Sequence, residues 1–222
     1  MSEAKYPILY EEKVLPGFSE FRYLTREGVN KATMQDFDYI VGSRANFNGF
    51  ARRLRVAKSM ESVSFNTFGE NTAKGYEALN RHFLMFSAYE RYVVDCEGLQ
   101  DGVYHMSLKY VPTEYFKEIK EAFDMVDTTD AVFDFLLQNC NSVLQRRSLK
   151  EFRTGTDFRK GIYISAMLRN SFAHGHLTAH LTDAPDRAVE MLCSFMTDFL
   201  YNAICHDFTQ RLKEVKLSIA AK

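Results

Sequence analysis

Several features that define familiar classes of protein are missing from this chain of 222 residues. No stretch approaches the roughly 18 consecutive apolar residues that a membrane-spanning helix needs, and the first residues lack the basic-then-apolar order of a secretory signal. The four cysteines form no C-x-x-C pair. We therefore expect reduced thiols and a cytoplasmic protein.

The chain also lacks an excess of charge of either sign. Its 28 Lys and Arg residues nearly balance its 29 Asp and Glu residues, which gives a formal net charge of -1. A protein that coats nucleic acid without sequence preference is usually more basic. Any contact with RNA must therefore come from a local patch or from a site that two subunits shape together. A Gly-rich phosphate loop and a G-x-S-x-G elbow are absent as well.

What the chain does have is helical periodicity. Its composition of 46% hydrophobic residues is that of an ordinary globular domain, and apolar residues recur at steps of three and four over most of the chain after residue 31. We predict an all-α bundle of about five long helices, with residues 32–222 as a single helical domain. The spacing predicts helices over about 32–56 (in one piece or in two, broken near Gly42 or Gly49), 70–95, 113–125, 129–144, 156–174 and from 183 onward.

Two segments fall outside this pattern. Residues 1–31 contain two prolines and two glycines and show no long period, which favours an irregular or partly extended segment packed on the body of the domain. Residues 102–111 alternate roughly between apolar and polar side chains and are bounded by a glycine and a proline. This pattern is typical of a short strand or an extended linker.

One short run, Arg169-Asn170-Ser171-Phe172-Ala173-His174-Gly175, combines side chains that suit phosphodiester chemistry. Arginine offers a fixed cationic fork for phosphate, and histidine exchanges protons near neutral pH. On an unbroken helix, residues five apart point about 140° away from each other, but Gly175 favours a helix end just before it. We expect His174 to fold back over the last turn toward Arg169, with Asn170 holding the directions of both groups.

The spacing Arg169-Asn170-x3-His174 resembles the signature of the HEPN superfamily, in which Arg, a polar residue and a later His mark a metal-independent ribonuclease centre. The resemblance implies an endoribonuclease without a cofactor, in which the 2′-hydroxyl of the RNA attacks and leaves a 2′,3′-cyclic phosphate and a 5′-hydroxyl. Arg169 would bind the scissile phosphate, and His174 would move a proton. Two subunits of the family typically place their motifs face to face, which implies a homodimer with a composite site.

The resemblance also implies a biological role as a toxin or an antiviral defence effector, restrained by an antitoxin or a sensor protein. Some family toxins carry a tyrosine two positions after the histidine, where this chain has His176. Control by modification of such a tyrosine is therefore not expected. Other members have the fold without demonstrated cleavage, so the alternative function is a catalytically silent module that binds a nucleotide, RNA or a protein partner through the same cleft.

Nearby residues support further hypotheses. His174, His176 and His180, with Cys205-His206 later in the chain, suggest a third option, a metal-dependent hydrolase, but the cluster contains no acidic residue and we predict no metal. His176 is instead a candidate RNA contact at the mouth of the cleft. A basic cluster before the motif helix is a second candidate RNA contact, although such runs are usually solvated helix faces. Its members are Arg146, Arg147, Lys150 and Arg153, with Arg159 and Lys160 just beyond.

Overall fold

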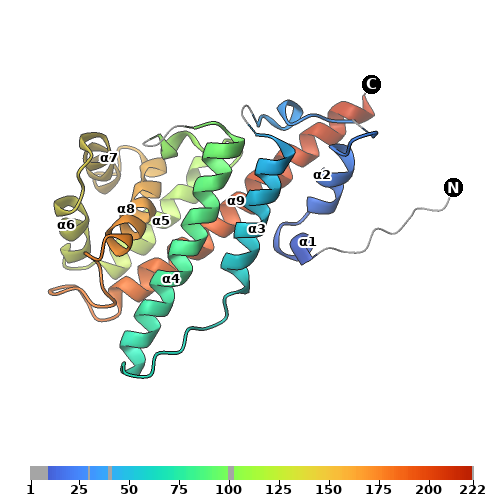
Figure 1. Ribbon diagram of the computed structural model, residues 1–222. Helices are drawn as coiled ribbons and strands as arrows, with labels where there is room; N and C mark the ends of the chain where they lie inside the picture. The colour runs from blue at the N-terminus through green and yellow to red at the C-terminus, as the bar shows by residue number, and fades with distance from the viewer. Residues whose placement is uncertain (1–9, 30, 40–41, 100–102, 222) are drawn as a thin grey trace.

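The computed structural model describes residues 10–29, 31–39, 42–99 and 103–221. Every regular element in these ranges is helical, which confirms the predicted all-α class (Figure 1). The α-helices are α1 (Tyr10–Val14), α2 (Phe18–Leu24), α3 (Arg44–Ser59), α4 (Glu70–Arg91), α5 (Thr113–Val126), α6 (Ala131–Gln138), α7 (Val143–Arg153), α8 (Ile162–Ala173) and α9 (Ala188–Ala220). Short 3-10 helices cover Gln35–Phe37, Tyr104–Met106 and Phe158–Gly161, and a π-turn over Tyr92–Cys96 extends α4.

Helices α4 and α9 form the centre of the molecule. They pack extensively against each other, and α3 and α8 lie against α4 on its two sides (Figure 1). The helix predicted from 183 onward begins at Ala188, and its apolar side chains are buried, as Leu192, Met196 and Leu200 show. Helix α4 with its π-turn covers the predicted range 70–95, and α5 covers 113–125, so both predictions are confirmed.

Residues 10–24 differ from the prediction of an irregular or extended segment, because they form α1 and α2. The Phe21 ring of α2 is buried and lies 4.1 Å from the Phe47 ring of α3 and 5.8 Å from the Phe208 ring of α9, centroid to centroid. Helices this short complete about two turns or fewer, which is too little chain for an apolar period to emerge. Residues 1–9 lie outside the described ranges.

The prediction of a strand or an extended linker between α4 and α5 was also wrong over residues 103–111. This segment contains a 3-10 helix and turns. Its buried apolar residues are Tyr104, Leu108 and Val111, so they follow steps of four and three. Over so short a segment, such steps resemble the alternation of a strand.

The predicted helix over 129–144 is divided in the structure, whereas the segment over 32–56 forms two pieces, as one of the predicted alternatives allows. In place of one helix over 129–144, α6 ends at Gln138 and α7 begins after Ser142. The Ser142 hydroxyl caps α7 by accepting a hydrogen bond from the Gln145 amide at 3.3 Å. The segment over 32–56 divides before α3, which includes Gly49 without a break; residues 40–41 lie outside the described ranges.

A close approach between α4 and the chain after α8 places the motif beside the central helices. A Cβ atom at Gly75 would lie 2.7 Å from Cβ and 3.1 Å from Cα of Ala179, so only glycine fits there. About one turn earlier, Thr72 Oγ1 and His180 Nε2 form a hydrogen bond of 2.9 Å. The connection that follows the motif is therefore attached to α4.

Candidate functional site

Helix α8 carries the motif and is enclosed along most of its length. Every residue from Ile162 to Leu168 is buried. On α4, Nε2 of His82 lies 3.0 Å from the carbonyl oxygen of Ser165 and 3.1 Å from its Oγ. Burial lowers the pKa of His82 to about 4, so the ring is neutral at pH 7 and fixes α8 against α4 as an uncharged hydrogen-bonding group.

The end of α8 lies where the sequence predicts, with His174 as the C-cap residue. Gly175 follows in the left-handed region at a φ of 74°. The N–H of Gly175 donates to the Phe172 carbonyl at 3.0 Å, and the N–H of His176 donates to the Ser171 carbonyl at 2.8 Å. These two bonds form a Schellman motif. The exposed side chain of His174 is thus presented from the helix end and not from the helix body.

Arg169 interacts with the side chains of α4. Its Nη2 donates to Glu90 Oε2 at 2.9 Å, and its Nη1 donates to Asn170 Oδ1 at 2.7 Å. The guanidinium carbon lies 5.7 Å from the ring centroids of both Phe83 and Phe86, within the range of cation–π attraction. The side chain is 27% exposed, while its Nε is buried without a hydrogen-bond partner among the described residues. The guanidinium of this arginine is therefore held in one orientation, but not all of its hydrogen-bond donors have partners.

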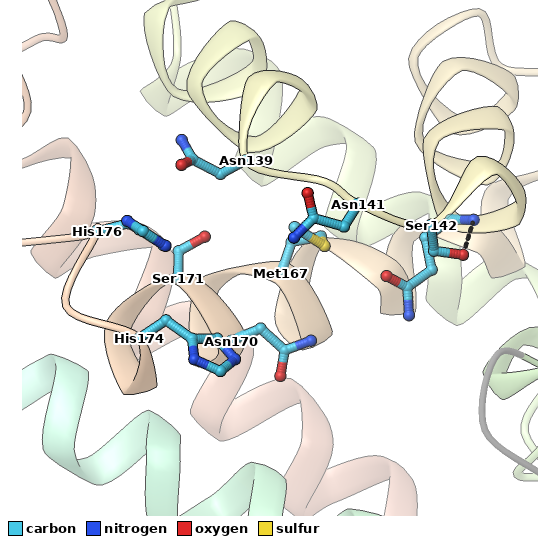
Figure 2. Close-up of a pocket in the computed structure, with 9 residues that line it drawn as sticks. Asn139, Asn141, Ser142, Met167, Asn170, Ser171, His174 and His176 are labelled. Atoms are coloured by element: carbon cyan, nitrogen blue, oxygen red, sulfur yellow. Dashed lines mark hydrogen bonds between the residues drawn. The ribbon is translucent and has the colours of Figure 1, made fainter.

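A pocket of about 290 Å³ opens beside the end of α8. Helix α8 and the turn after it form one wall, and the linker from α6 to α7 forms the other (Figure 2). Among the described residues that line the pocket, none is Asp, Glu, Lys or Arg, so its polarity comes from amides, hydroxyls and imidazoles. The lining residues are Asn139, Asn141, Ser142, Gln145, Met167, Asn170, Ser171, His174 and His176.

Three of the predicted site residues line this pocket, and Arg169 does not. Asn170, His174 and His176 line the pocket, and the two imidazole centroids are 6.3 Å apart. Arg169 does not line the pocket, and among the described residues no hydrogen bond joins it to His174. Asn170 connects the two, because its side chain binds Arg169 and its carbonyl oxygen accepts the N–H of His174 at 3.0 Å.

The other half of the pocket comes from residues that the sequence did not single out. Asn139 and Asn141 lie on the α6–α7 linker, inside the region 129–144 that was predicted as one helix, and Gln145 lies in the first turn of α7. The run Asn-Cys-Asn-Ser at 139–142 was the available signal, because Asn and Ser favour turns and N-caps over helix interiors. Ser171, inside the motif, was also missed; its Oγ is buried without a described partner.

All four residues of the predicted basic cluster lie on α7, and three of them face open solvent or a groove. Arg146 Nη2 donates to the Cys140 carbonyl at 2.6 Å, and Arg147 Nε donates to Glu151 Oε1 at 2.7 Å. With Lys150, these arginines line an open groove of about 420 Å³. The first turn of α7 borders the amide-lined pocket, and the basic residues of the same helix border the groove. Helix α7 therefore lies between the pocket and the groove.

Two further arginines of the basic run hold the fold together. Arg153 pairs with Asp124 at 2.7 Å and also with Asp130. Arg159 donates to four backbone carbonyl groups of the 105–111 segment. Neither side chain lines the pocket or the groove, so both act in tertiary packing.

The histidines and cysteine that suggested a metal site do not converge. Two of the histidines line the pocket, whereas His180 binds Thr72 of α4. His206 of α9 packs against Tyr115 of α5 with ring centroids 5.5 Å apart. Within the described ranges, no three His, Cys, Asp or Glu residues lie close enough together to hold a metal ion.

Comparison of the chain with protein-family models, with curated protein sequences and with solved structures found no match. In the part of the chain that the structure describes, no helix combines the length and the apolar character needed to cross a membrane. The functional argument therefore rests on the pocket and on the motif beside it.

Proposed function

We propose that this protein is a metal-independent endoribonuclease with Arg169, Asn170 and His174 at its centre. The observation that carries the proposal is the position of Asn170. Its carboxamide accepts a hydrogen bond from Arg169 at 2.7 Å, and it lines the pocket that also presents His174. Asn170 thus links an oriented cation to the pocket that presents an exposed imidazole, and this link supports the pairing of the two groups that phosphodiester cleavage requires.

In the proposed reaction, the ribose 2′-oxygen attacks the adjacent phosphorus. The bond from the 2′-oxygen to phosphorus forms, the bond from phosphorus to the 5′-oxygen breaks, and the products are a 2′,3′-cyclic phosphate and a 5′-hydroxyl. One proton leaves the 2′-hydroxyl and another is delivered to the 5′-oxygen. Arg169 stabilises the charge that develops on the phosphate, and His174 transfers one of the two protons.

The second proton transfer calls for a group on the other side of the phosphate. A homodimer with its two pockets face to face would supply a second His174 and a second Arg169. In this assembly, His176 at the pocket and Arg146, Arg147 and Lys150 at the groove remain the candidate RNA contacts. Arg153, the fourth member of the cluster, is paired with Asp124 and Asp130. We propose a role as a toxin or an antiviral defence effector, with an antitoxin or a sensor protein as its restraint.

Incubation of the purified protein with total tRNA and a labelled single-stranded RNA, in EDTA, tests this proposal. We expect cleavage that leaves 2′,3′-cyclic phosphate ends and that is abolished by Arg169→Ala and by His174→Ala, with the circular dichroism spectrum and dimer mass unchanged. His180→Ala is the matched control, because His180 is an exposed histidine of the same connection that does not line the pocket. The proposal would be contradicted if His174→Ala cleaved RNA as fast as the wild-type protein, or if EDTA abolished the cleavage.

A second candidate function is binding without cleavage. The Glu90 carboxylate already pairs with Arg169 at 2.9 Å, so a phosphate must compete with it for the guanidinium. A silent module would bind a nucleotide, RNA or a protein partner at the pocket without turnover, and its binding would weaken in Arg169→Ala and His174→Ala. Analysis of the RNA ends after incubation separates the two functions.

A further inference from the structure

We propose that two half-buried aromatic rings beside Arg169, those of Phe83 on α4 and Phe172 on α8, form a stacking platform for an unpaired base of single-stranded RNA. This inference rests on the proposed function, because it names the part of the substrate that lies next to the phosphate on Arg169. The two ring centroids are 6.3 Å apart, and the guanidinium carbon of Arg169 lies 5.7 Å from the Phe83 centroid. The three side chains are therefore direct neighbours.

Phe83 is less buried than the apolar residues that flank it on α4. Apolar residues recur at 79, 83 and 86, at the steps of four and three that place side chains on one face of a helix. Leu79 and Phe86 are each 1% exposed, whereas Phe83 between them is only half buried. Part of its ring therefore reaches the surface where α4 packs against α8.

Phe172 contributes the second ring from the last turn of α8. It is half buried as well, and its ring plane makes an angle of 75° with that of Phe83. The carbonyl oxygen of Phe172 accepts the N–H of Gly175 at 3.0 Å, in the turn that presents His174. The backbone that carries one ring of the platform is thus held by the same turn as the proposed catalytic histidine.

The cation beside the rings indicates which partner they fit. Arg169 is 27% exposed, so the same surface offers apolar rings and a positive charge. A nucleotide carries the matching pair, because its ribose joins a planar base to a phosphate. A phosphate bound to Arg169 would bring the attached base to the two rings, and proteins bind single strands by stacking bases on aromatic side chains and arginine planes. In a duplex, neighbouring base pairs cover the faces of each base, so the platform selects single strands.

Oligonucleotides that the proposed reaction cannot cleave test this inference. We would compare a short labelled oligothymidylate with an abasic deoxyribose-phosphate chain of the same length, which carries the same charge and no bases. Fluorescence anisotropy measures the affinity of the wild-type protein for each probe. The oligothymidylate is expected to bind about fivefold more tightly, from stacking of one base. Equal affinities would overturn the proposal whatever the variants do.

The variant Phe83→Ala should remove the preference for the probe with bases. Phe195→Ala is the matched control, because Phe195 is a half-buried residue of α9 whose ring also lies 6.3 Å from a second phenylalanine ring, that of Phe199. This control should keep the preference. Thermal melts establish that both variants fold. An unchanged preference in Phe83→Ala would overturn the proposal. If that variant also lost the dimer mass, the rings would belong to an interface between two copies.

A tryptophan at the same position reports stacking directly. The chain contains no tryptophan, so Phe83→Trp introduces a single fluorophore whose ring can still stack. Oligothymidylate should quench its fluorescence, and the abasic chain at equal saturation should not. Phe195→Trp should respond to neither probe. Unchanged fluorescence in Phe83→Trp that is saturated with oligothymidylate would contradict contact between the ring and a base.

The outcome is separable from that of the ribonuclease proposal. RNA cleavage together with equal binding of the two probes would retain the ribonuclease and refute the platform. A preference for the probe with bases, without any RNA cleavage, would retain the platform and favour the silent binding module.

Discussion

Two arginines of this chain, Arg211 on α9 and Arg169 on α8, are held in opposite ways. Arg211 is 3% exposed. Its Nε donates to Asp207 Oδ2 at 2.7 Å, its Nη2 donates to Glu97 Oε1 at 2.5 Å, and its Nη1 donates to the Phe37 carbonyl at 2.9 Å. Every nitrogen of this guanidinium is therefore bonded within the fold.

Arg169 has one carboxylate partner, one amide partner and an Nε with no partner among the described residues. The difference indicates where a cation is available to a ligand. A saturated arginine stabilises structure, whereas an oriented arginine that is partly exposed can still bind phosphate. Arg159, which donates to four carbonyl groups, resembles Arg211 although the sequence places it near the motif.

The largest effect is expected from breaking the Arg211 network. Arg211→Met leaves two carboxylates, Asp207 and Glu97, buried without their cation, so the free energy of unfolding should fall by about 3–5 kcal/mol. The matched variant Arg169→Met should lose about 1 kcal/mol or less, because its ion pair with Glu90 is partly exposed. Urea denaturation followed by circular dichroism measures both, and equal losses would contradict the distinction between the two arginines.

The next effect concerns the contact that holds α8 and Arg169 against α4. Burial lowers the pKa of His82 from 6.5 to about 4, so the unfolded chain takes up the proton first as the pH falls. The stabilisation is complete above pH 6.5 and is lost as the pH falls to 4, by about 3 kcal/mol in free energy of unfolding. Urea titrations across this range, compared with those of His82→Gln, isolate the contribution of this imidazole. A pH dependence that His82→Gln does not reduce would count against a buried neutral ring.

A smaller effect is expected at the helix end that presents His174. Gly175 has a φ of 74° and open space where a Cβ would lie, so Gly175→Ala costs about 1–2 kcal/mol from backbone strain alone. Thermal unfolding measures the loss. Ribonuclease activity should fall further than the folded fraction does, because the position of His174 depends on this turn. If stability fell and the activity of the folded protein were unchanged, the turn would not position the histidine.

The smallest effect is expected from weakening the ion pair between Arg169 and Glu90 while keeping the arginine. Glu90→Gln removes the charge that competes with a phosphate but keeps an oxygen that can accept a hydrogen bond from Arg169. RNA binding should tighten by at most about fivefold, which corresponds to about 0.2–1 kcal/mol, and the gain should shrink at high salt. Fluorescence anisotropy with a DNA oligonucleotide, which the proposed reaction cannot cleave, measures this change. Weaker binding by Glu90→Gln would indicate that the carboxylate positions the arginine more than it competes with the ligand.

The sequence predicts the long helices because each repeats its apolar period over many turns, as α4 and α9 do. It fails at the α6–α7 linker, because Val143 and Leu144 continue the apolar pattern although they are 85% and 47% exposed. The exposure of these two side chains depends on tertiary packing, which cannot be predicted from the spacing of apolar residues along the chain. The helix end at His174 is predictable, since Gly175 gives a direct backbone signal.

The motif at 169–175 supplies only some of the residues of the candidate site. Glu90, which orients Arg169, lies 79 positions earlier in the chain, and no local pattern connects the two. Asn139 and Asn141 reach the pocket because α6 and α7 fold against α8. The motif residues indicate the chemistry, whereas the partners that orient Arg169 and complete the pocket emerge from the packing of helices.

The most direct test of the account uses an RNA in which every 2′-hydroxyl except one is methylated, incubated with the protein in EDTA. Attack by the free hydroxyl predicts a single cut immediately 3′ of that nucleotide, with a 2′,3′-cyclic phosphate end. Wild-type protein and His180→Ala should make this cut, and Arg169→Met and His174→Ala should not. Cleavage of the fully methylated RNA, or an intact substrate after incubation with the folded protein, would contradict the claim that these two residues form a ribonuclease centre.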